Sequence, residues 1–172
     1  MLIGQTEIQL INDYQAVTRE EPSLIRASVA LILRDTHHGT EVLMMQRAKH
    51  ERDPWSGQMS FPGGKIESSD ASSKAAAIRE AHEEVGAKLT DNDYVGRLDD
   101  LFGLKVNDIF SAHVCCYVFK PTQAIHLKAN HEVADMVWLP LAFLNDVNNA
   151  FAFRHPRDPS LSMPSVMIDH GK

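Results

Sequence analysis

Three glutamates in the segment REAHEEVG form the densest group of side chains with the capacity for chemistry. Glu80, Glu83 and Glu84 stand at positions i, i+3 and i+4, and residues at these offsets share one face of a helix. Carboxylates that converge in this way repel one another, so the arrangement favours a cation between them. Mg²⁺ takes oxygen ligands and is commonly held by one or two carboxylates together with substrate phosphates. The spacing therefore predicts a divalent-metal site, with an ordinary helix that has a solvated acidic face as the alternative.

The helix that must carry these glutamates is predicted from its other face and its ends. Asp70 or Ser72 is placed to cap its N-terminus, and Gly86 is placed to end it in a left-handed conformation. We therefore expect a helix from about residue 73 to residue 85 that packs against a sheet. Its packing face consists of mostly small residues, namely Ala75, Ala77, Ile78, Ala81 and Val85.

The sequence around the glutamates resembles the box of the Nudix hydrolases, written G-x5-E-x7-R-E-U-x-E-E-x-G-U. The second half of this box is present as REAHEEVGA at positions 79–87. The loop from Gly64 to Arg79 is one residue longer than in the common box, and Asp70, or less directly Glu67, represents the early glutamate of the family. The resemblance implies an α/β fold of the Nudix type, an α/β/α sandwich with a mixed β-sheet, and hydrolysis of a diphosphate linkage.

The Nudix resemblance also implies individual roles. Glu80 and Glu84 are expected to be the principal ligands of Mg²⁺ or Mn²⁺, with Glu83 as a ligand directly or through water. The carbonyl oxygen of Gly63 would be a further metal contact, and Arg79 would orient a carboxylate rather than contact the substrate. In such a site the metal lowers the pKa of bound water and neutralises charge on the phosphates.

The general base is left open by the sequence. Glu80 is the first candidate, because a glutamate of the box serves this purpose in some members of the family. Glu132 and Asp108 are candidates from outside the box, and for both of them a charged surface residue is the alternative interpretation.

The stretch before the box resembles the signature of coenzyme A pyrophosphatases, roughly L-L-T-x-R-S-x3-R-x3-G-x3-F-P-G-G. Arg47, Arg52, Gly57 and the FPGG of positions 61–64 match it, although the gap between the second arginine and the glycine is one residue longer. The two arginines are predicted to bind phosphates bidentately, and Trp55 to stack on a base. The alternative places Arg47 at a strand end and Trp55 over the core.

Three functions are compatible with these patterns. The first is a metal-dependent hydrolase of a nucleoside diphosphate derivative, most specifically coenzyme A or a related compound. The second is a Nudix hydrolase of nucleoside triphosphates that removes unwanted nucleotides. The third is a non-catalytic Nudix-fold binding module, against which the intact set of three glutamates argues.

Composition and length set the outer bounds. A chain of 172 residues is most simply one domain, and the resemblance makes it a single Nudix hydrolase domain over 1–172. With 23 acidic and 17 basic residues the formal charge is −6, so a nucleic-acid polymer is not expected as a partner. The resemblance implies a small diphosphate substrate instead. The start lacks a signal sequence and no apolar run is long enough to cross a membrane, so we expect a cytoplasmic protein with no membrane partner. A homodimer is left open.

The remaining elements follow from periodicity and turn residues. Cys115 and Cys116 are adjacent, so on a strand they would point to opposite faces and stay free thiols. His37 and His38 are interpreted as a turn, and the pair Asp99 and Asp100 as a surface turn. We predict helices over 3–14 and 140–145, and strands over 24–33, 41–46, 94–101, 110–119, 132–139 and 164–168.

Overall fold

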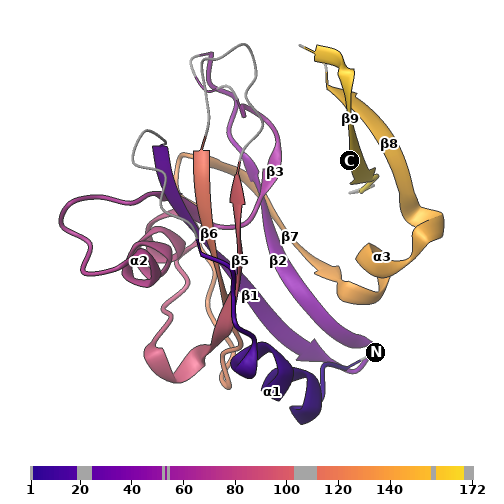
Figure 1. Cartoon of the computed structure of the whole chain (residues 1–172). Helices are drawn as coiled ribbons and strands as arrows, with labels where there is room; N and C mark the ends of the chain where they lie inside the picture. Colours follow the sequence, from indigo (N-terminus) through magenta and orange to yellow (C-terminus); the bar gives the residue numbers. More distant parts are fainter. Residues whose placement is uncertain are drawn as a thin grey trace.

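A mixed β-sheet forms the centre of the computed structural model, which describes residues 2–18, 25–51, 53, 55–102, 112–155 and 158–168. Within these residues, seven strands form one sheet with β3, β2, β1, β6 and β5 in order, while β4 pairs with β1 and β7 with β2 (Figure 1). The strands are β1 (Ile25–Thr36), β2 (Gly39–Arg47), β3 (Met59–Ser60), β4 (Gly63–Lys65), β5 (Tyr94–Phe102), β6 (Ala112–Phe119) and β7 (Val133–Pro140).

Strand β1 organises this sheet because it pairs with strands from three parts of the chain. It lies parallel to β6 and antiparallel to β2 and β4. The helices are α1 (Gln5–Asp13), α2 (Ser73–Val85) and α3 (Leu141–Asn145), with short 3-10 turns η1 (Asp91–Asp93) and η2 (Val147–Asn149). A separate hairpin of β8 (Ala150–His155) and β9 (Asp158–Val166) follows α3 (Figure 1).

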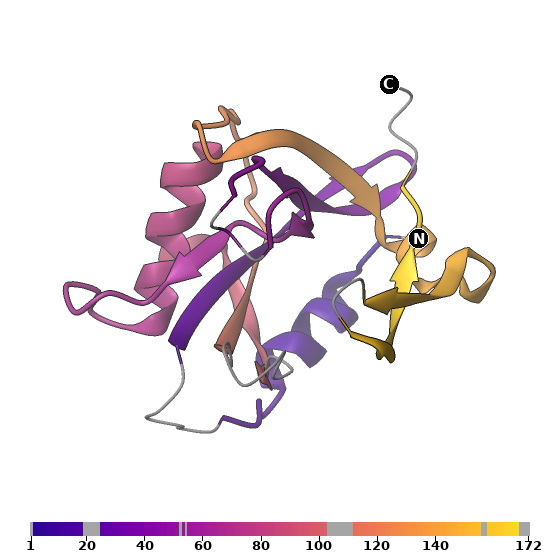
Figure 2. The same ribbon diagram turned by 90° about the horizontal axis from the view of Figure 1, so that it is seen from above.

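Two apolar cores lie on opposite faces of the sheet. Alternate residues of β1 enter different cores, Ile32 on the α2 side and Leu33 on the side of α1 and α3, as the period of two along a strand requires. Figure 2 shows α1 and α2 separated by the strands of the sheet. The helices therefore cover both faces, and the predicted α/β/α sandwich with a mixed sheet is confirmed.

Most of the predicted elements are present with shifted ends. The helix expected over 73–85 coincides with α2. Helix α1 is shorter at both ends than the predicted range 3–14. Helix α3 is one residue shorter than the predicted range 140–145, because Pro140 is its N-cap rather than its first residue. The strands predicted over 41–46, 94–101 and 132–139 correspond to β2, β5 and β7. Of the range 164–168, only the start belongs to a strand, the end of β9.

One predicted turn is wrong. Asp99 and Asp100 lie within strand β5 rather than in a surface turn, and the Asp100 side chain is 1% exposed. Its charge is compensated by Arg97 on the same strand and by His113 on β6, so the two adjacent acids do not form a solvated turn. The consequence is a buried polar cluster between β5 and β6.

The remaining general expectations have different outcomes. Cys115 and Cys116 lie on β6 as free, buried thiols, as predicted. No helix in the described part of the chain is long and apolar enough to span a membrane. The extent of the domain over 1–172, the cytoplasmic location and the homodimer stay predictions.

Candidate active site

Helix α2 is fixed at both ends by its own sequence. The Ser72 side chain accepts a hydrogen bond from the Ala75 N–H at 3.1 Å, so Ser72 rather than Asp70 is the N-cap. At the other end Gly86 adopts a φ of 70°, a left-handed conformation in which glycine is unstrained. The capped helix thereby holds its three glutamates in its last two turns.

Glu84 is the most deeply buried of the three. It is 2% exposed, and its Oε2 accepts a hydrogen bond from the backbone N–H of Gly63 at 2.8 Å. The pKa of Glu84 is raised to about 7. Burial is the largest cause, the nearby carboxylate of Glu80 acts in the same direction, and the hydrogen bond from Gly63 opposes both. A carboxylate that ionises with this difficulty gains from a cation beside it. The predicted contact of the Gly63 carbonyl oxygen with a metal stays a prediction.

The glycine pair lets β4 pass between β1 and α2. Gly63 has a φ of 157°, and an added Cβ there would lie 2.3 Å from the Ser28 carbonyl oxygen. At Gly64 an added Cβ would lie 2.6 Å from Cδ of Glu80. Both distances are too short for any side chain, so the two glycines are the reason that the backbone of β4 can approach the carboxylates so closely.

Arg79 is the centre of an ion network at the helix surface. Its guanidinium donates hydrogen bonds to Asp70 at 2.9 and 3.0 Å, to Glu80 at 2.8 Å and to Glu83 at 3.2 Å. It also donates to the carbonyl oxygen of Lys65 on β4. These hydrogen bonds hold the pKa of Asp70 below its usual range. The geometry is that of a residue that positions carboxylates, and Asp70 is the acid that positions Arg79.

Glu80 and Glu83 differ in their environment. The side chain of Glu80 is 14% exposed, whereas that of Glu83 is 54% exposed. Burial raises the pKa of Glu80, although the hydrogen bond from Arg79 opposes this shift. Glu83 is therefore the solvent-facing member of the set, which suits the weaker or water-mediated role expected for it.

A fourth carboxylate approaches the cluster from the start of β7. The charge of Glu132 raises the pKa of both Glu80 and Glu84. Its loop is attached to the site at two points, because the Glu132 carbonyl accepts from the Ala48 N–H at 2.7 Å and the Glu84 carbonyl accepts from the Asn130 N–H at 2.9 Å. Glu132 is thus brought to the three glutamates, while the other outside candidate, Asp108, lies outside the described residues.

Arg47 lies at the end of β2, near the same carboxylates. Its charge lowers the pKa of Glu84, and its Nε donates to Asp53 at 2.8 Å. Asp53 also accepts from the Trp55 N–H at 3.0 Å, and the Trp55 residue is 43% exposed, so it does not cover the core. Arg52 lies outside the described residues.

Two contributors to this site carry no recognisable signal in the sequence. Asp53 falls in the gap between Arg52 and Gly57, which is one residue longer than in the signature, and nothing in its neighbours marks it as the partner of Arg47. Asn130 acts through its backbone N–H, which every residue except proline has. The roles of Asp53 and Asn130 become visible only in the fold, where β2, α2 and the loop before β7 lie close together.

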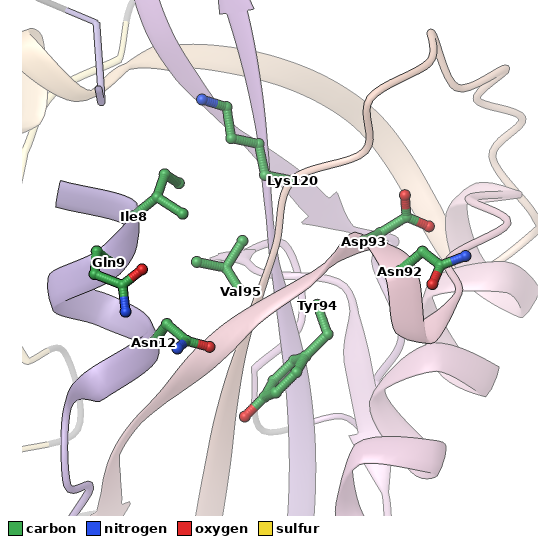
Figure 3. Close-up of a pocket in the computed structure, with 8 residues that line it drawn as sticks. All are labelled: Ile8, Gln9, Asn12, Asn92, Asp93, Tyr94, Val95 and Lys120. Carbon is green, nitrogen blue, oxygen red and sulfur yellow. The ribbon is translucent and has the colours of Figure 1, made fainter. Parts of the chain in front are cut away.

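A pocket of about 400 Å³ lies elsewhere, beside α1 (Figure 3). It is lined mainly by polar side chains of α1 and η1, together with the start of β5, and none of Glu80, Glu83 and Glu84 lines it. Its lysine, Lys120, is already bound, to Asp35 at 2.8 Å and to the Ile3 carbonyl oxygen at 3.2 Å. The pocket is therefore separate from the carboxylate cluster.

Comparison with known proteins agrees with this geometry. The chain is 34% identical over 120 residues to the probable nudix hydrolase C6G9.05 of Schizosaccharomyces pombe, which covers 69% of this chain and 41% of that protein. It is 36% identical over 104 residues to the Nudix hydrolase NudL of Enterobacter sp. (strain 638), which covers 59% of this chain and 50% of that protein. The chain thus spans half or less of the length of these relatives.

Solved structures share the fold at low sequence identity. The NUDIX domain of Shewanella oneidensis NrtR, in complex with ADP ribose, superimposes with a TM-score of 0.57 at 22% identity, covering 81% of this chain and 86% of that one. A bifunctional NMN adenylyltransferase/ADP ribose pyrophosphatase from Francisella tularensis, with AMP and a manganese ion, gives a TM-score of 0.50 at 23% identity, covering 69% and 34%. The model of the NUDIX domain matches residues 24–159, which include the whole carboxylate cluster, and the chain therefore belongs to the Nudix family.

Proposed function

We propose that the protein is a divalent-metal-dependent hydrolase that cleaves the diphosphate linkage of a small nucleoside diphosphate derivative. The observation that carries this proposal is the grouping of the three glutamates of α2 with Glu132, whose charge acts on Glu80 and Glu84, and the burial of Glu84, whose pKa is raised to about 7. Such a group of like charges is costly unless a cation compensates it. Family membership supports the same conclusion.

The donor set fits a hard cation. Glu80 and Glu84 offer carboxylate oxygens from the buried side of the site and Glu83 from its exposed side, so Mg²⁺ or Mn²⁺ would find oxygen ligands and room for water. When bound, such an ion would lower the pKa of a bound water and neutralise charge on the phosphates. Arg79, fixed by Asp70, holds the Glu80 carboxylate in place.

Among the candidate general bases we favour Glu132. Glu80 already accepts a hydrogen bond from Arg79 at 2.8 Å, so its carboxylate is part of the network that positions the site. The Glu132 side chain is 55% exposed and its charge acts on both Glu80 and Glu84, so in this proposal it accepts the proton of the attacking water. Glu132→Gln should then lower kcat by roughly 100-fold and leave the Mg²⁺ concentration for half-maximal rate nearly unchanged, whereas Glu80→Gln should raise that concentration.

The substrate class is proposed from the residues around the cluster. Arg47 lies close enough to Glu84 to contact a phosphate that is bound there, and the partly exposed Trp55 beside it offers a surface for a base. The Shewanella domain binds ADP ribose and the Francisella enzyme is an ADP ribose pyrophosphatase, which supports a nucleoside diphosphate joined to a second group. Coenzyme A is the more specific proposal, and it rests on the signature before the box.

A substrate panel tests this function. Purified protein is incubated with Mg²⁺ or Mn²⁺ and with coenzyme A, ADP-ribose, NADH, a dinucleoside polyphosphate or nucleoside triphosphates, and the products are identified by mass. We expect metal-dependent cleavage of a diphosphate linkage, abolished by EDTA and retained in a control variant, Glu7→Gln, that removes an exposed acid from α1. A 4′-phosphopantetheine product would support coenzyme A.

Two results would contradict the proposal. Faster turnover of nucleoside triphosphates than of any diphosphate-linked compound would favour a hydrolase that removes unwanted nucleotides. Binding of these compounds without any turnover, in a protein that retains its native circular dichroism, would favour a binding module.

A further inference from the structure

A second cluster of metal-ligating side chains lies between β5 and β6. Asp100 comes from β5, and His113 and Cys115 are two residues apart on β6, so their side chains share one face of that strand. The pairing of the two strands is irregular between Leu98 and Leu101, which is where Asp100 joins the cluster. One donor atom from each of the three residues lies within 4.8 Å of the other two.

This cluster is separate from the glutamates of α2 and lies near the start of that helix. Arg97, which contacts the cluster, lies over the ring of Tyr117 at 5.3 Å. The Tyr117 hydroxyl is 2.6 Å from Oγ of Ser73, the first residue of α2. Glu80 and Glu84 belong to the last two turns of the same helix, so the two groups of side chains lie toward opposite ends of it.

The three ligand types are those of a transition-metal site. Zn²⁺ in proteins is bound by cysteine sulfur, histidine nitrogen and carboxylate oxygen, usually in a tetrahedron. In such a tetrahedron, bonds of about 2.3 Å to sulfur and about 2.0 Å to nitrogen place the two atoms about 3.5 Å apart. The Cys115 Sγ to His113 Nε2 distance is 3.9 Å. The Nε2 to Asp100 Oδ2 distance is 2.8 Å, so the carboxylate and the imidazole would separate by roughly half an ångström.

The contacts around the cluster hold the three donor atoms close together. Arg97 donates to Oδ1 of Asp100 and lies 3.4 Å from Sγ of Cys115, so its guanidinium orients the carboxylate and leaves Oδ2 toward His113. In the described structure Nδ1 of His113 has no hydrogen-bond partner. Exchanging the bond from Nε2 to Asp100 for a bond to a metal ion would therefore break no other hydrogen bond of the ring.

We propose that Asp100, His113 and Cys115 form a binding site for a transition-metal ion of the Zn²⁺ type, distinct from the Mg²⁺ or Mn²⁺ site on α2. On binding, the Cys115 thiol releases its proton to solvent, and the proton that Nε2 of His113 donates to Asp100 moves to Nδ1, so that the neutral ring offers Nε2 to the ion. The buried position of all three residues predicts slow exchange of the ion. Arg97 contributes one positive charge next to two anionic ligands, so the site tolerates a divalent cation with moderate rather than extreme affinity.

Cobalt titration of the full chain tests this site directly. Co²⁺ is added to metal-free protein in the presence of excess Mg²⁺, which occupies the glutamates, and the thiolate-to-cobalt charge-transfer absorption is recorded after equilibration. The chain has two cysteines, so this absorption reports on Cys115 or Cys116. We expect one equivalent of the signal in the wild type, its loss in Cys115→Ser, and its retention in Cys116→Ser, the matched control on the opposite face of β6.

The outcome in the wild type decides the proposal even if a variant is unstable. Absence of any thiolate signal at millimolar Co²⁺ would overturn it, and so would a signal that survives Cys115→Ser. Displacement of Co²⁺ by one equivalent of Zn²⁺, with an increase in Tm of the wild type that is lost in His113→Gln, would support it. Because the readout is sulfur ligation in the presence of Mg²⁺, failure of this proposal leaves the hydrolase proposal unaffected.

Discussion

The two polar groups that α2 connects differ in almost every physical respect. The cluster of Glu80, Glu83 and Glu84 with Glu132 consists of one type of donor, is open at its rim, and carries an excess of negative charge. The group between β5 and β6 combines a carboxylate, an imidazole and a thiol, is closed to solvent, and contains its own cation, Arg97. Both contain a buried acid. Asp100 is paired with Arg97 and His113, whereas in the first group Arg79 binds Glu80 and Glu83, and the buried Glu84 accepts its hydrogen bond from a backbone N–H.

The hydrogen-bond and ion-pair partners of a buried carboxylate, rather than the number of acids around it, decide what it can do. Glu84 receives one backbone hydrogen bond and faces other carboxylates, and its pKa rises to about 7. Asp100 receives a guanidinium and an imidazole. We therefore expect the first group to bind an exchangeable cation from solution, and the second to stabilise the sheet even without a metal ion.

The largest expected effect is on the closed group. Asp100→Asn keeps the volume of the side chain but removes the charge that Arg97 and His113 face, so we expect the free energy of unfolding to fall by about 3–5 kcal/mol. Urea denaturation measures this loss. Asp99→Asn is the matched control, because its carboxylate accepts hydrogen bonds near the surface and should cost about 1 kcal/mol. Equal losses in the two variants would remove the contrast between an exposed and a buried acid.

The charge of the open group should make the stability of the protein depend on pH. Because the pKa of Glu84 is raised from 4.5 to about 7 in the folded protein, the folded state binds this proton more tightly than the unfolded state. The contribution of Glu84 to the free energy of unfolding is therefore greatest below about pH 4.5. It falls as the pH rises to about 7, by at most about 3 kcal/mol. Urea unfolding in EDTA at several pH values measures the fall. Glu84→Gln should reduce it, and a variant curve with the same slope would refute the assignment.

Glu84→Gln should also have the largest catalytic effect. The change removes a charged ligand but little volume, so we expect the fold to be retained and kcat to fall by at least about 100-fold, or about 2.7 kcal/mol. Steady-state kinetics at saturating Mg²⁺ gives the number. Turnover near that of the wild type would defeat the metal site on α2.

A smaller effect is expected from the acid that positions Arg79. Asp70→Asn removes the charge that two N–H groups of Arg79 bind, so Glu80 should be held less firmly and kcat should fall by about 10-fold. The exposed side chain of Glu67 has no such contact with Arg79 in the structure, and Glu67→Gln distinguishes the two acids that represent the early glutamate of the box. A larger loss in Glu67→Gln than in Asp70→Asn would reverse this assignment.

The smallest expected effect is on substrate affinity. Asp53→Asn weakens the bond that fixes Arg47, so KM should rise by about 5-fold, close to 1 kcal/mol, while kcat changes little. Glu51→Gln, an exposed change in the same loop, is the control for the loss of one negative charge. If both variants raise KM equally, the effect is one of net charge rather than of the position of Arg47.

The sequence predicts the parts of the molecule whose signals are local. The range 73–85 was recognisable as a helix because its cap, its glycine stop and its apolar period lie within fifteen residues. Strands β3 and β4 have two and three residues, too short for any periodicity, and they exist because β2 and β1 provide partners for them. The same limit explains the error at Asp100, whose partner His113 comes from another strand.

The candidate site divides in the same way. The three glutamates and Arg79 are visible from their spacing, since a helix turns a spacing into a common face. The contacts between Asp53 and Arg47, and between Asn130 and the end of α2, depend on loops whose mutual approach no local pattern encodes. Residue types and spacing thus predict the chemistry of the site, but not the groups that position it.

The parallel pairing of β1 with β6 imposes an order on folding. The two strands are separated by about half of the chain, as the hydrogen bond from Ser28 to the Cys115 carbonyl over 87 positions illustrates, and pairings of this range form slowly because a long loop must close first. A growing chain that has just completed α2 already contains every glutamate of the helix. It lacks β6 to complete the sheet on which α2 packs, and the loop before β7 that holds the end of that helix. The glutamates of the helix are therefore synthesised before the strand and the loop that complete the site around them.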